Sequence, residues 1–145
     1  MRSIHQERGA ELIELAIVLP LLMLLFAAVV DFGLMFQRYL VVTNAAREGA
    51  RIAVLPEYNK PADVVARATQ YVQEGLGDNT LAPTVTYATR LIDPDAGGPA
   101  PGFTAADVTV ELTHNYVVLG PVVSLVTGGS FGSVTLAARS TMRVE

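Results

Sequence analysis

The most constraining feature of the sequence is an apolar run near its N-terminus. From Leu15 to Val30 no residue is charged or strongly polar, and the apolar character resumes after Asp31 as far as Phe36. As a helix the uninterrupted run is roughly 24 Å long and the extension to Phe36 makes it about 33 Å, against about 30 Å for the hydrocarbon region of a bilayer. We therefore predict one membrane-spanning helix, because an amphipathic helix of a soluble protein needs a polar face that this run lacks.

The residues before the apolar run are unusual for a secretory signal. They are short and polar, they include Arg2 and Arg8, and they end at Gly9. Glu11 and Glu14 follow at the start of the run, where an ordinary signal peptide avoids acidic residues. Glu14 lies inside the predicted span, and an ionised carboxylate there costs a few kcal/mol unless it finds a partner. This arrangement argues against simple signal-peptide processing.

Arg8-Gly9 followed by AELIE resembles a class III prepilin leader. The wider stretch from residue 9 to 55 resembles the TadE-like family of minor pilins, or pseudopilins, of the tight-adherence pilus. The segments NAAREGAR and VTLAARSTMRVE are similar to that family too. Major pilins of this system carry tyrosine after the glutamate, whereas Leu15 follows Glu14 here, which favours a minor subunit.

The resemblance implies that a prepilin peptidase cuts after Gly9 and leaves Ala10 as the first residue of the mature chain. Arg8 would keep the leader on the cytoplasmic side, and glycine lets a protease approach the backbone closely. The new amino group of Ala10 would lie near Glu14 of an adjacent subunit and set axial register. The implied partners are other pilin subunits, the prepilin peptidase, the inner-membrane pilus assembly machinery and membrane lipid. The implied location is the bacterial inner membrane, single-pass with the N-terminus inside and the head outside, and then the pilus at the cell surface.

Two further residues of the span are assigned with Glu14 to assembly and register. Pro20 removes one backbone hydrogen bond and should bend or loosen the helix, either as a tolerated membrane proline or as a melting point that lets subunits pack. Asp31 is expected at the outer interface in contact with headgroups and water, in preference to a buried functional carboxylate.

The helix is predicted to continue beyond the membrane as far as Leu55, since no proline occurs until Pro56. A continuous helix from Ala10 to Leu55 would be about 69 Å long. Its second half carries small residues at steps of three and four, which permit the close approach of another helix. This helix-packing face consists of Ala45, Ala46, Gly49, Ala50 and Ala53.

The remainder predicts a small α+β head. A second helix should begin near Pro61 and end before Gly77, with an apolar face of Ala62, Val65, Ala68, Tyr71 or Val72, and Leu76. Alternating patterns predict antiparallel strands at Thr84–Ile92, Asp107–Val118 and Ser133–Val144. Residues 93–104 should form an exposed loop. Residues 119–132 should form a connection that packs on the sheet or on a neighbour and has room for one helical turn. The expected domains are a leader at 1–9, the transmembrane and assembly helix at 10–55, and an extracytoplasmic head at 56–145.

The composition excludes several functions. The formal charge of -4 argues against nucleic acid binding, and the absence of cysteine excludes disulfides and thiol chemistry. The only lysine, Lys60, is in no phosphate-loop motif, and His5 lies in the predicted leader. His114 is expected to be a buried or edge histidine of a strand, and Asp93 and Asp95 a solvated turn rather than a calcium site. We expect no enzymatic activity, no cofactor and no metal.

Two other functions stay open on the sequence alone. The chain is either a minor pilin, an uncleaved single-pass module whose head binds a ligand, or a secreted protein cut near Phe26-Ala27-Ala28. Each predicts a different mature N-terminus.

Overall fold

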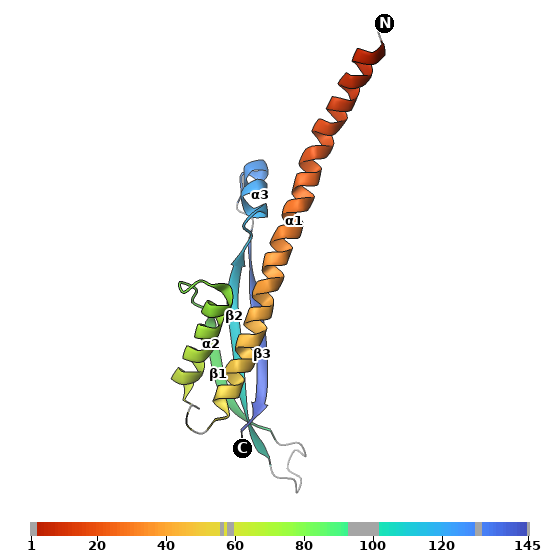
Figure 1. The fold of residues 1–145 in the computed structure, drawn as a ribbon. Coiled ribbons are helices and arrows are strands. Elements are labelled where there is room, and N and C mark those ends of the chain that lie inside the picture. Colours follow the sequence, from red (N-terminus) through yellow and green to blue (C-terminus); the bar gives the residue numbers. More distant parts are fainter. Residues whose placement is uncertain (1–2, 56, 58–59, 93–101, 130–131, 145) are drawn as a thin grey trace. The chain divides into compact units, whose positions relative to one another are not determined.

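The computed structural model describes residues 3–55, 57, 60–92, 102–129 and 132–144. It contains helix α1 (Ser3–Ala53), helix α2 (Pro61–Leu76), strand β1 (Thr84–Ile92), strand β2 (Phe103–Asn115), helix α3 (Leu119–Thr127) and strand β3 (Ser133–Arg143) (Figure 1). The predicted α+β class, with a long N-terminal helix, a short second helix and a three-stranded antiparallel sheet, is confirmed.

The chain forms two compact units. The first comprises Met1–Leu34 and Asn115–Gly132, and so holds the N-terminal part of α1 together with α3. The second comprises Met35–His114 and Ser133–Glu145, and so holds the rest of α1, α2 and the sheet. Helix α1 therefore contributes to both units.

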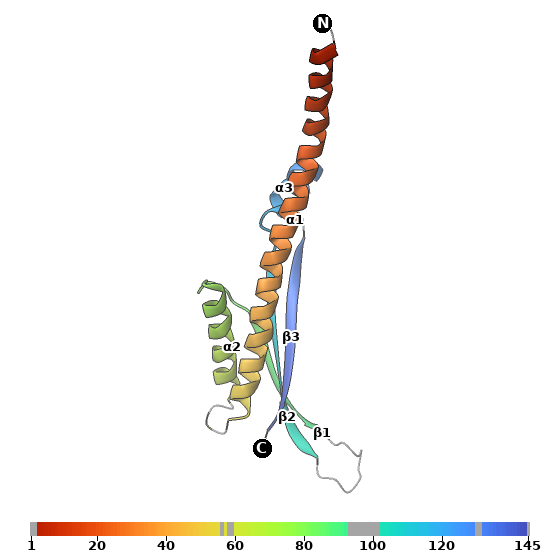
Figure 2. The same cartoon turned by 45° about the vertical axis from the view of Figure 1, so that its right-hand side comes forward.

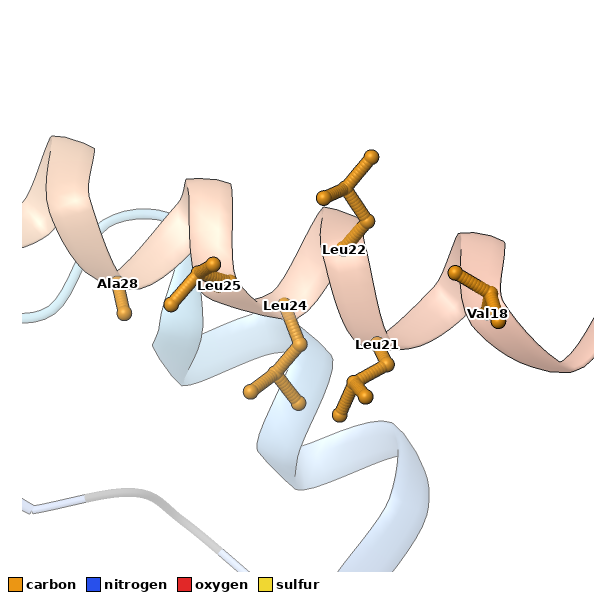
Figure 3. A pocket seen from close by; sticks show the side chains of 6 residues that line it. All are labelled: Val18, Leu21, Leu22, Leu24, Leu25 and Ala28. Carbon is orange, nitrogen blue, oxygen red and sulfur yellow. The ribbon is translucent and has the colours of Figure 1, made fainter.

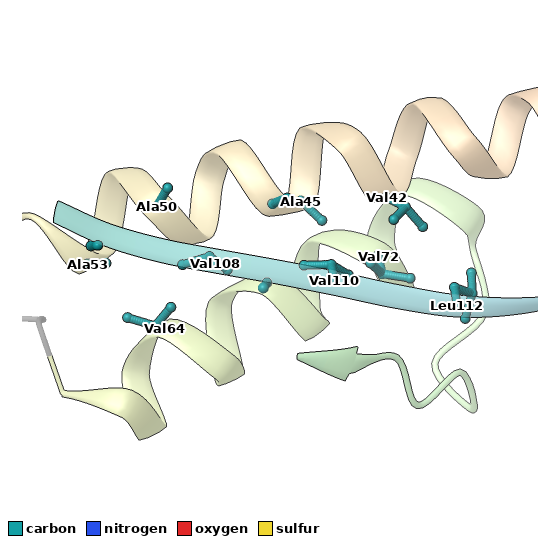
Figure 4. Close-up of a cluster of buried hydrophobic side chains, with 12 residues drawn as sticks. Val42, Ala45, Ala50, Ala53, Val64, Val72, Val108, Val110 and Leu112 are labelled. Carbon is teal, nitrogen blue, oxygen red and sulfur yellow. The ribbon is translucent and has the colours of Figure 1, made fainter. Parts of the chain in front are cut away.

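The second unit is a sheet with helices on one face. The strand order is β1-β2-β3, and β1 runs antiparallel to β2 with Thr84 opposite Glu111 and Ile92 opposite Phe103 (Figure 2). The C-terminal part of α1 and all of α2 pack on the face of β2 that carries the even-numbered residues (Figure 4). The fully or almost fully buried residues of this core are Val42, Ala45, Ala46, Ala50, Ala53, Val64, Ala68, Val72, Ala106, Val108, Val110 and Leu112.

Small side chains let the second half of α1 lie close to its neighbours. A Cβ placed on Gly49 would lie 3.0 Å from Val108 Cγ1 and 3.4 Å from Ala68 Cβ, so even an alanine here would require its neighbours to shift. Beside this contact the carboxylate of Glu48 accepts hydrogen bonds from Arg51 at 2.9 Å and from Arg67 of α2 at 3.2 Å. Helices α1 and α2 are thus joined by close packing and by one ion pair.

Helix α2 begins and ends where the sequence predicts. Pro61 occupies its first turn, and Gly77 ends it in the left-handed conformation (φ 66°) with its N–H donating to Glu74 O at 3.3 Å. The predicted apolar face is wrong at its N-terminal end, because Val64 is buried while Ala62 is exposed and Val65 half-buried. Either Val64 or Val65 could belong to an apolar face that includes Ala68, since they lie four and three residues before it. The buried face contains Val64, Ala68 and Val72.

The strands follow their predicted patterns with one correction. β1 has the predicted bounds, and β3 ends one residue early at Arg143. β2 begins at Phe103 and ends at Asn115, so the prediction of Asp107–Val118 is wrong at both ends. Ala105, Ala106 and Asp107 are all buried, so this central strand shows no alternation where it begins. The predicted loop is therefore strand at 103–104, and its residues 93–101 lie outside the described part of the chain.

Gly49→Val should lower the free energy of unfolding by about 2 kcal/mol, because the added methyl groups would overlap Val108 and Ala68. The measurement is thermal unfolding of the full chain in detergent, followed by tyrosine fluorescence. Gly33→Val is the matched control, since it makes the same change in the same helix where nothing lies within 4 Å of a Cβ. Equal destabilisation by the two variants would contradict the close packing at Gly49.

Candidate assembly site

The N-terminal part of α1 presents an apolar surface that the described part of the chain leaves largely uncovered. Between Glu11 and Leu34 most side chains are exposed, among them Ile17 at 71% and Leu21 at 70%. In this range only Ala27 and Asp31 are buried among the described side chains. Within the described residues, this helix is the one that is long and apolar enough to cross a membrane. Such a surface needs lipid or other apolar helices as its surroundings.

The predicted processing and register residues lie on this helix. Arg8, Gly9 and Ala10 are part of its helical backbone, so the helix begins before the predicted cleavage point. A Cβ on Gly9 would meet nothing within 4 Å, and Glu14 is exposed. Their roles in cleavage and in register stay predictions.

Pro20 lies inside α1, and the helix continues on both sides of it. Together with Met23 and Phe26 it lines a shallow apolar pocket that is completed by Leu24, Ala27, Val118 and Val122. Val118, the N-cap residue of α3, and Val122 of α3 therefore lie against α1 near Pro20.

Asp31 accepts hydrogen bonds from three backbone N–H groups of the first unit. Its side chain is 0% exposed, so the prediction that it contacts headgroups and water is wrong. Oδ1 accepts the N–H groups of Val117 at 3.1 Å and Val118 at 3.0 Å, and Oδ2 accepts those of Val118 at 3.1 Å and Leu119 at 2.6 Å. One carboxylate therefore holds the turn that opens α3.

This contact explains why a helix of nine residues forms where the sequence predicts a packed connection with at most one helical turn. The N-cap residue of α3, Val118, has no side chain that accepts a hydrogen bond, and Asp31 supplies the acceptor instead. At the other end Gly128 adopts φ 68° and its N–H donates to Ser124 O at 2.9 Å. Sequence reasoning missed α3 because its cap comes from more than 80 residues away.

Helix α3 lies beside the span. Figure 3 shows Leu21 and Leu24 extending toward α3 and Leu22 extending to the opposite side of α1. These residues belong to a further apolar surface pocket of α1, which Val18, Leu21, Leu22, Leu24, Leu25 and Ala28 line.

The predicted small-residue face is covered within the chain. Ala45, Ala46, Gly49, Ala50 and Ala53 are all buried in the core of the second unit, against α2 and β2. The close approach that these residues permit is therefore used by elements of this chain, and packing against another subunit there stays a prediction.

The second unit holds one polar cluster that sequence reasoning missed. Asp107, on the face of β2 opposite the core, is 6% exposed and contacts side chains from both neighbouring strands. Arg90 Nε lies 3.0 Å from Oδ2, Arg139 pairs with the same oxygen, and Thr141 donates its hydroxyl to Oδ1. The Thr141 hydrogen bond and the two guanidinium groups hold the pKa of Asp107 below its usual value, although burial opposes them. The sequence shows the alternation around Asp107, but it does not show that β1 and β3 place Arg90 and Arg139 beside this residue.

The remaining candidate chemical groups of the sequence lie as follows. His114 is fully buried in phase with Val110 and Leu112, as predicted for a strand histidine. Among the described residues no group of three or more acidic, histidine or cysteine side chains could hold a metal ion. Asp93 and Asp95 lie outside the described residues.

The apolar run of α1 is preceded by Gly9 and two acidic residues, Glu11 and Glu14. Residues 9–51 match the family model of TadE-like proteins. The TadE-like match confirms the resemblance on which the processing and assembly expectations rest, and it begins at Gly9. α2, α3, the sheet and the C-terminal segment VTLAARSTMRVE lie outside the matched residues. No significant match was found among curated proteins or among solved structures.

Lowering the pH should destabilise the head through Asp107. Its pKa is lower in the folded than in the unfolded chain, so its contribution is complete above about pH 4 and is lost as the pH falls through the folded-state value. Asp107→Asn should remove this pH dependence and cost about 1–2 kcal/mol at neutral pH.

The measurement for Asp107 is denaturant unfolding of the full chain in detergent at a series of pH values. Glu111→Gln neutralises an exposed carboxylate on the same face of the same strand and serves as control. An equal loss of unfolding free energy in both variants would contradict the stabilising role of the Asp107 ion pairs.

Proposed function

We propose that this chain is a minor pilin of a tight-adherence pilus, cleaved after Gly9 by a prepilin peptidase and assembled through its apolar helix. The single observation that carries the proposal is the TadE-like match over residues 9–51, which starts at the glycine of the proposed cut and covers the exposed apolar surface. The chain would act as a structural subunit in adhesion, surface attachment and pilus biogenesis, and not as an enzyme.

Before assembly the protein would sit in the bacterial inner membrane as a single-pass subunit. Its N-terminus would be inside and its sheet outside, and the subunit would then move into the pilus or to its base. The exposed apolar side chains from Leu12 to Phe36 support this location, because lipid covers them in the membrane and neighbouring helices cover them in a fibre. Its partners would be other pilins, the peptidase, the assembly machinery and lipid.

Cleavage would create the group that Glu14 needs. The amino group of Ala10 would carry positive charge near neutral pH, and Glu14 lies one helical turn further along. In a bundle of staggered subunits the amino group of one chain would pair with Glu14 of the next. That pairing would offset the desolvation of the carboxylate in a low-dielectric environment and would fix how far the subunits are shifted along the fibre axis.

Glu14→Ala should leave membrane insertion unchanged and reduce incorporation into pili at least about tenfold, because the amino terminus of the neighbouring subunit loses its buried partner. The measurement is the amount of the chain in sheared pili relative to membranes of its host. Glu11→Ala is the matched control, since it removes a carboxylate from the preceding turn. Unchanged incorporation of Glu14→Ala would remove the role assigned to Glu14.

A further inference from the structure

We propose that α3 is a second membrane-embedded element, which enters the outer leaflet beside the span and is held there by Asp31. The proposal rests on the membrane anchoring in the proposed function and adds to it a lipid-contacting segment more than 80 residues away from the span in the sequence. The occupant of the apolar face of α3 is the acyl-chain region of a bilayer.

The depth of α3 follows from its contacts with α1. Val118 and Val122 line the same pocket as Pro20, Met23 and Ala27, which belong to the uninterrupted apolar run. Asp31 lies at the outer end of that run and holds the first turn of α3. If lipid surrounds residues 15–30 of α1, it therefore also reaches the residues of α3 that lie at the same level.

The composition of this segment suits lipid. From Asn115 to Gly132 there is no charged residue. On α3 the side chain of Leu125 is 87% exposed, Val122 is 37% exposed, and Val117 just before the helix is 56% exposed. An apolar face of this kind is costly in water, and it continues the apolar surface of the span.

The N–H groups at the start of α3 and its two hydroxyl groups have partners within the protein. Backbone N–H groups have no water to bind in hydrocarbon, so a helix start there needs a protein acceptor. Asp31 accepts three N–H groups at this start. Ser124 donates its hydroxyl to Pro121 O at 2.8 Å and Thr127 donates to Val123 O at 2.9 Å, so both hydroxyls bond within the helix.

The length of α3 determines whether it can cross the bilayer or only enter one leaflet. Nine residues rise about 13 Å, less than half of the hydrocarbon thickness of about 30 Å. The helix therefore enters one leaflet without crossing the membrane. It widens the part of the chain that is embedded in that leaflet.

The test uses the natural absence of cysteine, which lets one introduced thiol carry one spin label. Leu125→Cys probes α3, Ile17→Cys probes the span, and Leu91→Cys probes an apolar residue of β1 that is 72% exposed. The labelled full chains are placed in vesicles of phosphatidylethanolamine and phosphatidylglycerol. The measured quantity is the ratio of collision rates with oxygen, which concentrates in lipid, and with a nickel chelate, which stays in water.

The ratio at Leu125→Cys should be at least about threefold higher than at Leu91→Cys and should approach that at Ile17→Cys. A ratio equal to that at Leu91→Cys would overturn the proposal, and so would low collision with both reagents, which would mean that a second copy of the chain covers α3. A water-like ratio at Ile17→Cys would contradict the membrane anchoring itself, and the inference would fall with it.

A second variant tests the tether. Asp31→Ala combined with Leu125→Cys should lower the oxygen ratio toward the Leu91→Cys value, because α3 loses the acceptor for its first turn. Asp78→Ala is the matched control, since Asp78 also accepts a backbone N–H, that of Thr80 at 2.9 Å, but in the second unit. An unchanged ratio in the Asp31→Ala variant would refute the tether. If that variant fails to insert, the three single-label sites with Asp31 intact still decide whether α3 is in lipid.

Discussion

Most apolar side chains of the first half of α1 are left exposed by the described part of the chain, and that constraint determines what the rest of the molecule must do. Each large apolar side chain left in water costs about 1.5–3 kcal/mol relative to burial, so the surface between Leu12 and Phe36 needs lipid or other helices. The second half of the same helix is different. Its small residues are enclosed by α2 and β2 in the core of the second unit.

Two carboxylates meet the low-dielectric environment in opposite ways. Asp31 finds its partners within the chain, in the three backbone N–H groups at the start of α3. Glu14 is exposed, and our proposal gives it a partner from the neighbouring subunit after cleavage. In this account, a buried acid that is satisfied internally organises the anchor of one subunit, whereas an acid that is not covered by its own chain organises the contact between subunits.

Local patterns in the sequence predicted most of the elements. The long N-terminal helix, the cap residues Pro61 and Gly77, and the strand from Thr84 to Ile92 each depend on neighbouring residues, and these elements form as predicted. The errors occur where distant residues decide. α3 forms because Asp31 caps it. The first half of β2 contains the run 105–108, which is buried on both faces, and Asp107 is paired with arginines from the strands on either side. These contacts join residues that are far apart in the sequence, so a pattern of neighbouring residues cannot reveal them.

The central claim is that the chain becomes an assembly subunit only after its inner end is trimmed at Gly9. The most direct test is the N-terminal sequence and intact mass of the protein purified from the membranes of its host. Our account predicts that the mature chain begins at Ala10. A chain that still begins at Met1, or that begins near residues 28–30, would contradict it.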